Sequence, residues 1–283
     1  MLNIIKDVLI DACIDSLKIL PFLFITYLIM EYIEHKMTEK SKETIKKSGK
    51  WGPLLGSAVG IIPQCGFSAS ATNLYSARVI SIGTLIAVYL STSDEMIPVF
   101  LSESISATTL IQILLIKFAI GMVFGFIIDF ALRKRKNSEE EKIEDICVHE
   151  HCHCEEKGIF KSAIKHTINI LIYIFIITLV IDLIVALVGE ENITNFVGNH
   201  TILGPAISSL IGLIPNCAAS VILANLYIGG IITKASLIGG LLTGAGVGLI
   251  VLFKTNKNIK ENIAITCLLY VIGVFSGIIL QFI

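Results

Sequence analysis

Long apolar segments alternate with short polar ones along this chain. Apolar segments run over roughly 9–33, 108–132, 164–188 and from 263 onward, and two longer tracts with short polar breaks run over 51–101 and 202–253. A helix needs about 20 apolar residues to cross a hydrocarbon core about 30 Å thick. The pattern therefore predicts an all-α polytopic membrane protein, with broken helices in the two long tracts.

Composition strengthens this prediction. Hydrophobic residues make up 54% of the 283 positions and charged residues 16%, and the mean hydropathy is +0.81. A soluble domain carries about a quarter charged residues. The net charge of −1 excludes a protein that binds nucleic acid by neutralising phosphates. The sequence has no glycine-rich phosphate loop followed by Lys, so ATP-driven pumping by this chain is not expected.

The chain contains an internal repeat. The same residue types recur at an offset of 152 positions, as at Pro63 and Pro215 (215 − 63 = 152). Further identical pairs are Gly60/Gly212, Cys65/Cys217, Ser68/Ser220, Asn73/Asn225 and Tyr75/Tyr227. The sequence therefore divides into a first membrane repeat at 1–132, a polar linker at 133–158 and a second membrane repeat at 159–283.

The charges of equivalent loops indicate that the two repeats are inverted. The loop at 36–50 has six Lys and two Glu, whereas its equivalent at 188–202 has two Glu and no Lys or Arg. Cytoplasmic loops of membrane proteins are enriched in Lys and Arg. We therefore expect a multi-pass protein of the cell membrane with two inverted-topology repeats, both termini outside and the linker in the cytoplasm.

Each long tract predicts a helix that stops partway through the membrane. The segment 51–62 forms at most about 18 Å of helix, which is too short to cross. Pro63 disfavours helix at the preceding residue, so the chain is expected to turn there. A re-entrant hairpin and a pair of short, tilted spans both fit. In either case the tips, at 63–65 and 215–217, are expected to meet at the midplane, as the broken helices of secondary transporters do.

Polar side chains cluster around both tips. A Ser or Asn in a membrane helix commonly forms an interhelical hydrogen bond, but non-helical backbone at membrane depth is tolerated where it lines a cavity. Because the repeat pairs most of these residues, we interpret them as substrate-binding: Gln64, Cys65, Ser68, Asn73, Asn216, Cys217, Ser220 and Asn225.

Two carboxylates break the symmetry of the repeats. Asp94 and Glu95 have no charged equivalent in the second repeat, and apolar residues continue beyond them as far as Leu101. We therefore expect both to lie within the membrane, where carboxylates act as ion ligands or proton carriers. The alternative is a position at the outer interface. Lys117, a further charge in an apolar segment, is left without a role.

The linker is rich in thiols and imidazoles. Six of them lie within eight residues, namely Cys147, His149, His151, Cys152, His153 and Cys154. Such ligands suit zinc, cadmium, copper or trivalent arsenic, whereas manganese prefers carboxylates such as Asp94 and Glu95. The linker is predicted to bind metal, although a polar tether that chelates without a function has the same composition. The two candidate sites favour different ions.

These motifs resemble those of the ten-helix heavy-metal exporter family, bacterial permeases labelled arsenic efflux proteins or manganese transporters. The resemblance rests on GIIPQCGFS at 60–68, NLY at 73–75, LSTSDE at 90–95, GLIPNC at 212–217 and the linker rich in His and Cys. It covers most of the chain and implies efflux of a metal or metalloid across the cell membrane.

The expected function is a secondary transporter that exports a divalent metal or arsenite by alternating access, in exchange for protons; an enzyme is not expected. One alternative is a transporter of a small organic anion. Another is an intramembrane thiol enzyme using Cys65 and Cys217, which the lack of His at the tips disfavours. The expected partners are the lipid bilayer, the ion, protons and a second copy of the chain in a homodimer. No cofactor is expected besides a metal ion as substrate or linker ligand.

Overall fold

In the computed structural model the chain is helical almost throughout the part that is described. The described residues are 6, 9–10, 12–14, 16–17, 20–21, 24–25, 27–28, 49–62, 65–93, 96–102, 105–133, 159–188 and 203–282. They contain helices and turns and no β-strand. The prediction of an all-α chain is confirmed for these residues.

The first repeat contains a series of short helices followed by a long one. A 3-10 turn, η1 (Gly49–Trp51), leads into α3 (Gly52–Gly60), α4 (Cys65–Ser76), α5 (Ile82–Ser91), α6 (Met96–Ser102) and α7 (Ala107–Arg133). The second repeat has α10 (Ile159–Val188), α12 (Gly204–Gly212), α13 (Cys217–Ile228), α14 (Lys234–Thr243), α15 (Val247–Thr255) and α16 (Ile259–Gln281). The order of helix lengths from α3 to α7 matches that from α12 to α16.

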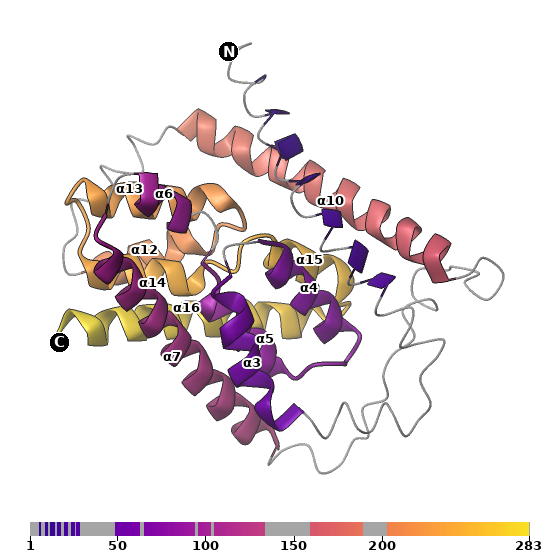
Figure 1. Cartoon of the computed structure of the whole chain (residues 1–283), viewed down its shortest axis with the longest axis horizontal. Helices are drawn as coiled ribbons and strands as arrows, with labels where there is room; N and C mark the ends of the chain where they lie inside the picture. Colours follow the sequence, from indigo (N-terminus) through magenta and orange to yellow (C-terminus); the bar gives the residue numbers. More distant parts are fainter. Residues whose placement is uncertain are drawn as a thin grey trace.

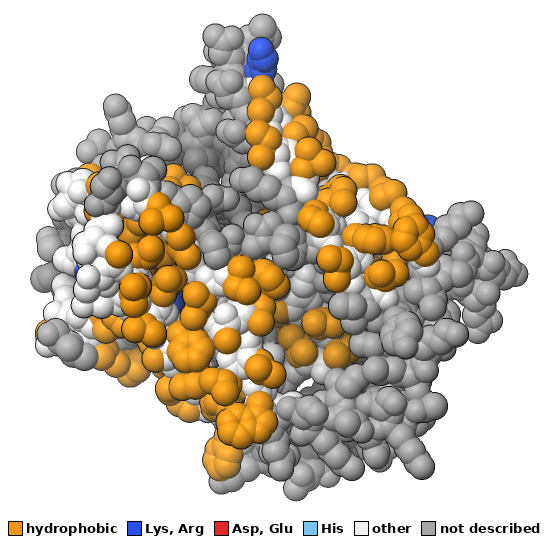
Figure 2. All heavy atoms as spheres, viewed as in Figure 1, with side chains coloured by type: hydrophobic (Ala, Val, Ile, Leu, Met, Phe, Trp, Pro, Cys, Tyr) orange, Lys and Arg blue, Asp and Glu red, His pale blue; other side chains and the backbone are white. Residues whose placement is uncertain are grey.

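Three described stretches are long and apolar enough to span a bilayer. They are Ala107–Leu132, Lys234–Thr255 and Ile259–Gln281. The first and last are only 28% and 33% buried in the protein, whereas the middle one, which joins α14 to α15, is 89% buried. Figure 1 accordingly shows α7 along an edge of the bundle. In Figure 2 hydrophobic side chains cover much of the described surface, as lipid contact requires.

Glycines allow the helices of each repeat to pack closely. In the first, α5 lies between α3 and α7, and in the second α14 lies between α12 and α16. A Cβ placed on Gly121 would lie 2.9 Å from the carbonyl oxygen of Ala87, and one on Gly273 would lie 2.8 Å from that of Gly239. Small residues let membrane helices approach in this way. The two contacts are equivalent, because both residues of the second lie 152 positions after their counterparts in the first (273 − 121; 239 − 87).

The turns after α4 and α13 are also equivalent. The amide of Val79 donates to the carbonyl of Leu74 at 2.9 Å, and the amide of Ile231 donates to that of Leu226 at 2.9 Å. Each turn contains one residue in the left-handed region, Arg78 with φ 59° and Gly230 with φ 71°. Gly adopts this conformation without the steric cost that a side chain adds. Arg78 must therefore be held by other contacts.

The short helical arms follow the predicted boundaries. Helices α3 and α12 have nine residues each and end at Gly60 and Gly212. Helices α4 and α13 have 12 residues each, about 18 Å, and begin at Cys65 and Cys217. No one of these four arms is long enough to cross the bilayer by itself. The helices of the two repeats also interlock, because α4 packs against α15 and α13 packs against α6.

Candidate functional site

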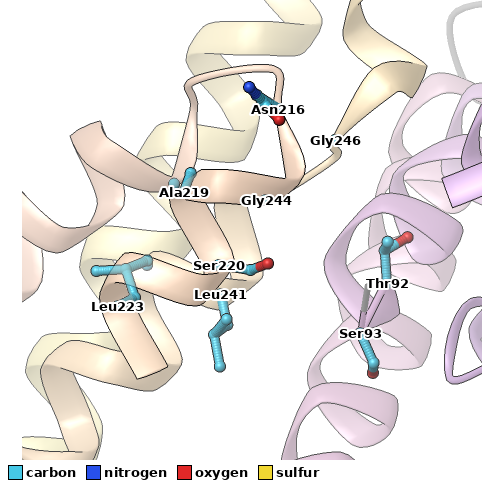
Figure 3. Close-up of a pocket in the computed structure, with 11 residues that line it drawn as sticks. Thr92, Ser93, Asn216, Ala219, Ser220, Leu223, Leu241, Gly244 and Gly246 are labelled. Atoms are coloured by element: carbon cyan, nitrogen blue, oxygen red, sulfur yellow. The ribbon is translucent and has the colours of Figure 1, made fainter. Parts of the chain in front are cut away.

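A small cavity lies where the second repeat's hairpin meets the interruptions of two central helices (Figure 3). One interruption separates α5 from α6 and contributes Thr92 and Ser93. The other separates α14 from α15 and contributes Gly244 and Gly246. The hairpin contributes Asn216 and Ser220. Apolar side chains, including Leu223 and Leu241, complete the lining.

Hydroxyl groups satisfy the last carbonyls of α5. Ser91 Oγ donates to the carbonyl of Ala87 at 2.7 Å, and Thr92 Oγ1 donates to that of Val88 at 2.8 Å. Ser93 Oγ donates to the carbonyl of Ser91 at 3.2 Å. All three side chains are buried. These hydroxyls therefore add side-chain hydrogen bonds to the carbonyls around the end of α5.

The second interruption combines backbone bonds with the hydroxyl of Thr243, which donates to the carbonyls of Ser209 and Gly240 at 2.7 and 2.8 Å. Gly246 has φ 53° and ψ −140°, a conformation that L side chains rarely adopt. The amide of Ala245 donates to the carbonyl of Thr243 at 2.8 Å, and the amide of Gly248 donates to that of Ala245 at 3.1 Å. The sequence Gly-Ala-Gly thus interrupts the helix between α14 and α15 without adding a polar side chain to the cavity.

The hairpin tip places Asn216 beside these interruptions. Asn216 is 5% exposed and precedes the first turn of α13. Its backbone N–H donates to the carbonyl of Ile214 at 2.7 Å. Ser220 follows one turn later and projects toward the same space (Figure 3). Cys217, the first residue of α13, is not described beyond its backbone. The hairpin tip therefore places the side-chain amide of Asn216 and the hydroxyl of Ser220 at the N-terminal end of α13.

The equivalent region of the first hairpin is filled. Thr72 Oγ1 and the Tyr89 hydroxyl lie 2.5 Å apart, and the Tyr89 hydroxyl donates to the carbonyl of Gly248 at 3.1 Å. A Cβ on Gly248 would lie 2.7 Å from the Tyr89 ring and 3.0 Å from the Cβ of Ser68. Here α4 therefore packs directly against the start of α15 and leaves no space beside Tyr89. The counterpart of Tyr89 is Leu241 (241 − 89 = 152), and the space beside Leu241 remains open as the cavity.

A charged network joins the first repeat to the second at the far end of α4. Arg78 Nη1 and Nη2 each donate to Glu261 at 3.1 Å, and the Tyr75 hydroxyl donates to the same carboxylate. Asn256 Nδ2 donates to Glu261 at 3.2 Å. Ser76 Oγ and Thr255 Oγ1 lie 2.7 Å apart. These bonds hold Arg78 in its left-handed conformation and tie the α4–α5 turn to the start of α16.

Of the predicted tip residues, the structure brings Asn216 and Ser220 together at the cavity. Ser68 and Asn73 are buried on α4 away from it, and Tyr27 donates to Asn73 Oδ1 at 3.2 Å. Asn225 is exposed on α13. Residues for which the structure gives no side-chain placement are Gln64, Cys65, Asp94, Glu95, Cys217 and the linker residues Cys147, His149, His151, Cys152, His153 and Cys154.

The sequence did not single out Thr92 and Ser93 as site residues. The sequence does contain an indication of their position, because both belong to the polar break that precedes Asp94. Within the described parts of the chain, no group of three His, Cys, Asp or Glu side chains converges to hold a metal. The donors that these parts offer at the cavity are hydroxyls, an amide and backbone carbonyls, which as oxygen ligands favour hard cations.

Comparison with known proteins identifies one family. Residues 3–190 match the family described as "Putative, 10TM heavy-metal exporter". No curated protein and no solved structure gives a significant match.

Proposed function

Because this chain belongs to the heavy-metal exporter family, a family of multi-pass membrane proteins, we propose that it exports a divalent metal or arsenite across the cell membrane in exchange for protons. The observation that carries this proposal is the cavity at which two interrupted helices and a hairpin tip meet. Interrupted helices around a polar site are the arrangement by which secondary transporters hold an ion near the midplane.

The proposed architecture is a pair of inverted repeats whose broken helices meet at the membrane midplane. Equivalent glycine contacts and equivalent turns at an offset of 152 residues support the repeat. The opposite charges of the equivalent loops at 36–50 and 188–202 support the inversion. In this arrangement both termini lie outside and the linker at 133–158 lies in the cytoplasm. A topology reporter at Thr44 and another at Asn195 are expected on opposite sides of the membrane; the same side for both contradicts the inversion.

The proposed binding site combines the described cavity with the carboxylates that follow it in sequence. Thr92 and Ser93 line the cavity, and Asp94 and Glu95 are the next two residues. Carboxylate, hydroxyl and amide oxygens together suit a divalent cation such as Mn²⁺.

The interlocked helices support the proposal of alternating access. The α4–α15 and α13–α6 contacts connect the two repeats on either side of the cavity. Rocking one repeat against the other opens one of these contacts while the other stays closed. The cluster of thiols and imidazoles at 147–154 captures ions on the cytoplasmic side and passes them to the cavity.

Transport into inside-out vesicles tests this function. Vesicles that contain the purified chain should accumulate Mn²⁺, Zn²⁺ or arsenite when their lumen is acidic, and Asp94→Asn should abolish the accumulation without changing the amount of folded protein. A deletion strain should retain excess metal or arsenic. Vesicles that take up none of these ions contradict the proposal.

A small organic anion is the second candidate substrate. The N-termini of α13 and α15 lie beside the cavity, directly after Asn216 and Gly246, which line it. The amide ends of helices favour negative charge. Competition assays in the same vesicles separate the two candidates, because organic acids should compete for uptake in this case and metals should not.

A further inference from the structure

Two unequal polar contacts join the repeats. In the first, Arg78 and Tyr75 bond to Glu261. In the second, Lys234 Nζ donates a single exposed hydrogen bond to Gln112 Oε1 at 2.7 Å. The first contact ties the turn after α4 to the start of α16, and the second ties the start of α14 to the first part of α7. Each therefore joins one repeat to the last long helix of the other, but only the first is an ion pair.

The repeat shows that the scaffold does not require this ion pair. Arg78 corresponds to Gly230 (230 − 78 = 152), and Glu261 corresponds to Thr109 (261 − 109 = 152). Because Gly230 has no side chain, the second repeat forms the same turn without an ion pair. Gly230 also adopts the left-handed conformation without the steric cost that Arg78 incurs. A turn that only had to join two helices would not need the arginine.

The tyrosines of the two repeats also differ in what they contact. The Tyr75 hydroxyl donates to Glu261. Its counterpart Tyr227 (227 − 75 = 152) stacks instead on Phe100 of α6, with ring centroids 6.0 Å apart. An aromatic stack can slide without a large loss of contact, whereas a bidentate ion pair requires a defined geometry. The contact around Glu261 is therefore the one that has two distinct states, formed and broken.

A hydroxyl pair lies between the charged network and the cavity. Thr72 Oγ1 and the Tyr89 hydroxyl lie 2.5 Å apart, and both are bonded to the carbonyl of Gly248. Thr72 is four residues before the end of α4 at Ser76, about 6 Å along the helix. Gly248 follows Gly246, which lines the cavity, by two residues. The contact of α4 with α15 therefore separates the charged network from the cavity.

The ion pair lies where water can reach it. The side chains of Arg78 and Glu261 are 19% and 22% exposed, whereas Thr72 and Tyr89 are fully buried. Water can therefore solvate both charges when the pair separates, which keeps the separation reversible. In the proposed topology this end of α4 faces the cytoplasm.

We propose that the Arg78–Glu261 ion pair is the cytoplasmic gate of the transport path. The pair is formed while the cavity is closed to the cytoplasm. It breaks when α4 moves away from α15, which also parts Thr72 from Gly248 and opens the cavity to the cytoplasm. This inference rests on the proposed function and assigns its gate.

A reversible cross-link beside the ion pair tests the gate. The hydroxyl oxygens of Ser76 and Thr255 lie 2.7 Å apart across α4 and α15. In the double variant Ser76→Cys/Thr255→Cys, a disulfide would hold these helices together. Inside-out vesicles that contain this variant should lose Mn²⁺ uptake when diamide is added and regain it when dithiothreitol is added. A purely structural contact predicts no such loss, because strengthening it leaves transport unchanged.

Two controls account for the oxidation itself. The single variants Ser76→Cys and Thr255→Cys contain the same native thiols and should respond to diamide as the wild type does. Ser81→Cys/Thr84→Cys is the matched control for the disulfide, because these hydroxyls lie 2.8 Å apart at the start of α5, within one repeat. Its Mn²⁺ uptake should be the same as that of the wild type before and after oxidation.

Breaking the ion pair should have the converse effect. Thr72→Cys places a thiol behind the gate, at a position that is fully buried. In inside-out vesicles, a membrane-impermeant thiol reagent should label Thr72→Cys faster when Glu261→Gln is added. In right-side-out vesicles the labelling rate should not rise. Gln112→Ala, which removes the exposed bond to Lys234, is the control and should not raise labelling from the cytoplasmic face.

The possible results separate the gate from the proposed function. Mn²⁺ uptake that continues after Ser76→Cys/Thr255→Cys is cross-linked overturns the gate and leaves metal export standing. Thiols that never join do the same, because the closed contact would then not be populated. Labelling of Thr72→Cys that does not rise with Glu261→Gln, or rises only from the outer face, also overturns it. Wild-type vesicles that take up neither Mn²⁺ nor arsenite overturn the proposed function itself.

Discussion

The two repeats build the same scaffold around different centres. Their glycine contacts, their helix turns and their helix starts agree, for example at Ser81 and Thr233, each of which caps the following helix with its hydroxyl. Their interruptions do not agree. The first has Thr92 and Ser93 followed by two carboxylates, and the second has Gly244 and Ala245. The packing is therefore common to both repeats, whereas of the two interruptions only the first carries hydroxyl and carboxylate groups that can bind an ion.

A second difference decides where the cavity lies. Tyr89 and Thr72 fill the space between α4 and α15 with a bonded pair of hydroxyls. Their equivalents in the second repeat are Leu241 and Ala224. These side chains are smaller and have no polar group to fill the gap, and Leu241 lines the cavity. One aromatic residue therefore makes the scaffold asymmetric although its backbone is repeated.

The largest expected effect comes from removing the charge that only the first repeat carries. Asp94→Asn should reduce transport about 100-fold, because removing one charged partner from a buried site costs about 3 kcal/mol. Flux is measured in vesicles. Gly246→Asp places a carboxylate at the equivalent position of the second repeat (246 − 94 = 152) and should not rescue Asp94→Asn. Wild-type flux in Asp94→Asn would place that residue at the outer interface.

The next effect tests whether the duplicated packing is of equal importance in both repeats. A Cβ on Gly212 would overlap the carbonyl oxygen of Gly240, and one on Gly60 would lie 2.7 Å from that of Val88. Gly212→Ala and Gly60→Ala should each lower the free energy of unfolding by about 1–3 kcal/mol. Unfolding in denaturant measures this loss. Gly49→Ala, where nothing lies near the added Cβ, is the control. A change confined to one repeat would contradict the common scaffold.

A smaller effect is expected at the Arg78–Glu261 pair. Both side chains are about one-fifth exposed, and hydrogen bonds to a charged group contribute about 1.5–3 kcal/mol. Glu261→Gln should therefore lower stability by about 1–2 kcal/mol. Arg78→Gly should lose less, because it removes the pair but relieves the left-handed conformation, as Gly230 does in the other repeat. A double-mutant cycle with thermal unfolding measures the coupling, and no coupling would mean that the pair does not hold the turn.

The smallest effect concerns the linker. Deletion of 147–154 should raise the metal concentration needed for half-maximal transport a few-fold and leave the maximal rate unchanged, because the segment only concentrates ions near the entrance. Initial rates in vesicles give both quantities. Deletion of 137–144, a polar segment of equal length without His or Cys, is the control. Complete loss of transport in the first deletion would make the linker part of the translocation path.

Local patterns in the sequence predicted much of the scaffold. Local sequence marks the hairpin tips by their prolines, and it marks the helix breaks at 91–95 and 243–248 by their polar residues and glycines. The observed helices end close to these positions. The sequence could not predict which hairpin borders the cavity. That depends on α4 packing against α15, a contact between residues about 180 positions apart whose closeness is set by the size of Tyr89 and the absence of a side chain at Gly248.

The burial and hydrogen bonding of Lys117 could not be predicted from the sequence for the same reason. In the sequence it is a single charge within an apolar segment, and the spacing of its neighbours indicates only that it faces inward. The Lys117 amine donates to the backbone carbonyl of Thr92, which is 25 residues away in the chain. Every residue has a carbonyl, so no pattern of side chains marks that contact. Only the point at which α5 ends makes the carbonyl of Thr92 available.

The crossing of α4 onto α15 has a consequence for biogenesis. One hairpin arm of each repeat, α4 or α13, packs against a helix of the other repeat. Neither repeat therefore has a complete hydrophobic core until both have entered the bilayer. A gene cut within 134–158 should therefore yield two fragments that are degraded when expressed singly and accumulate as a stoichiometric pair when expressed together.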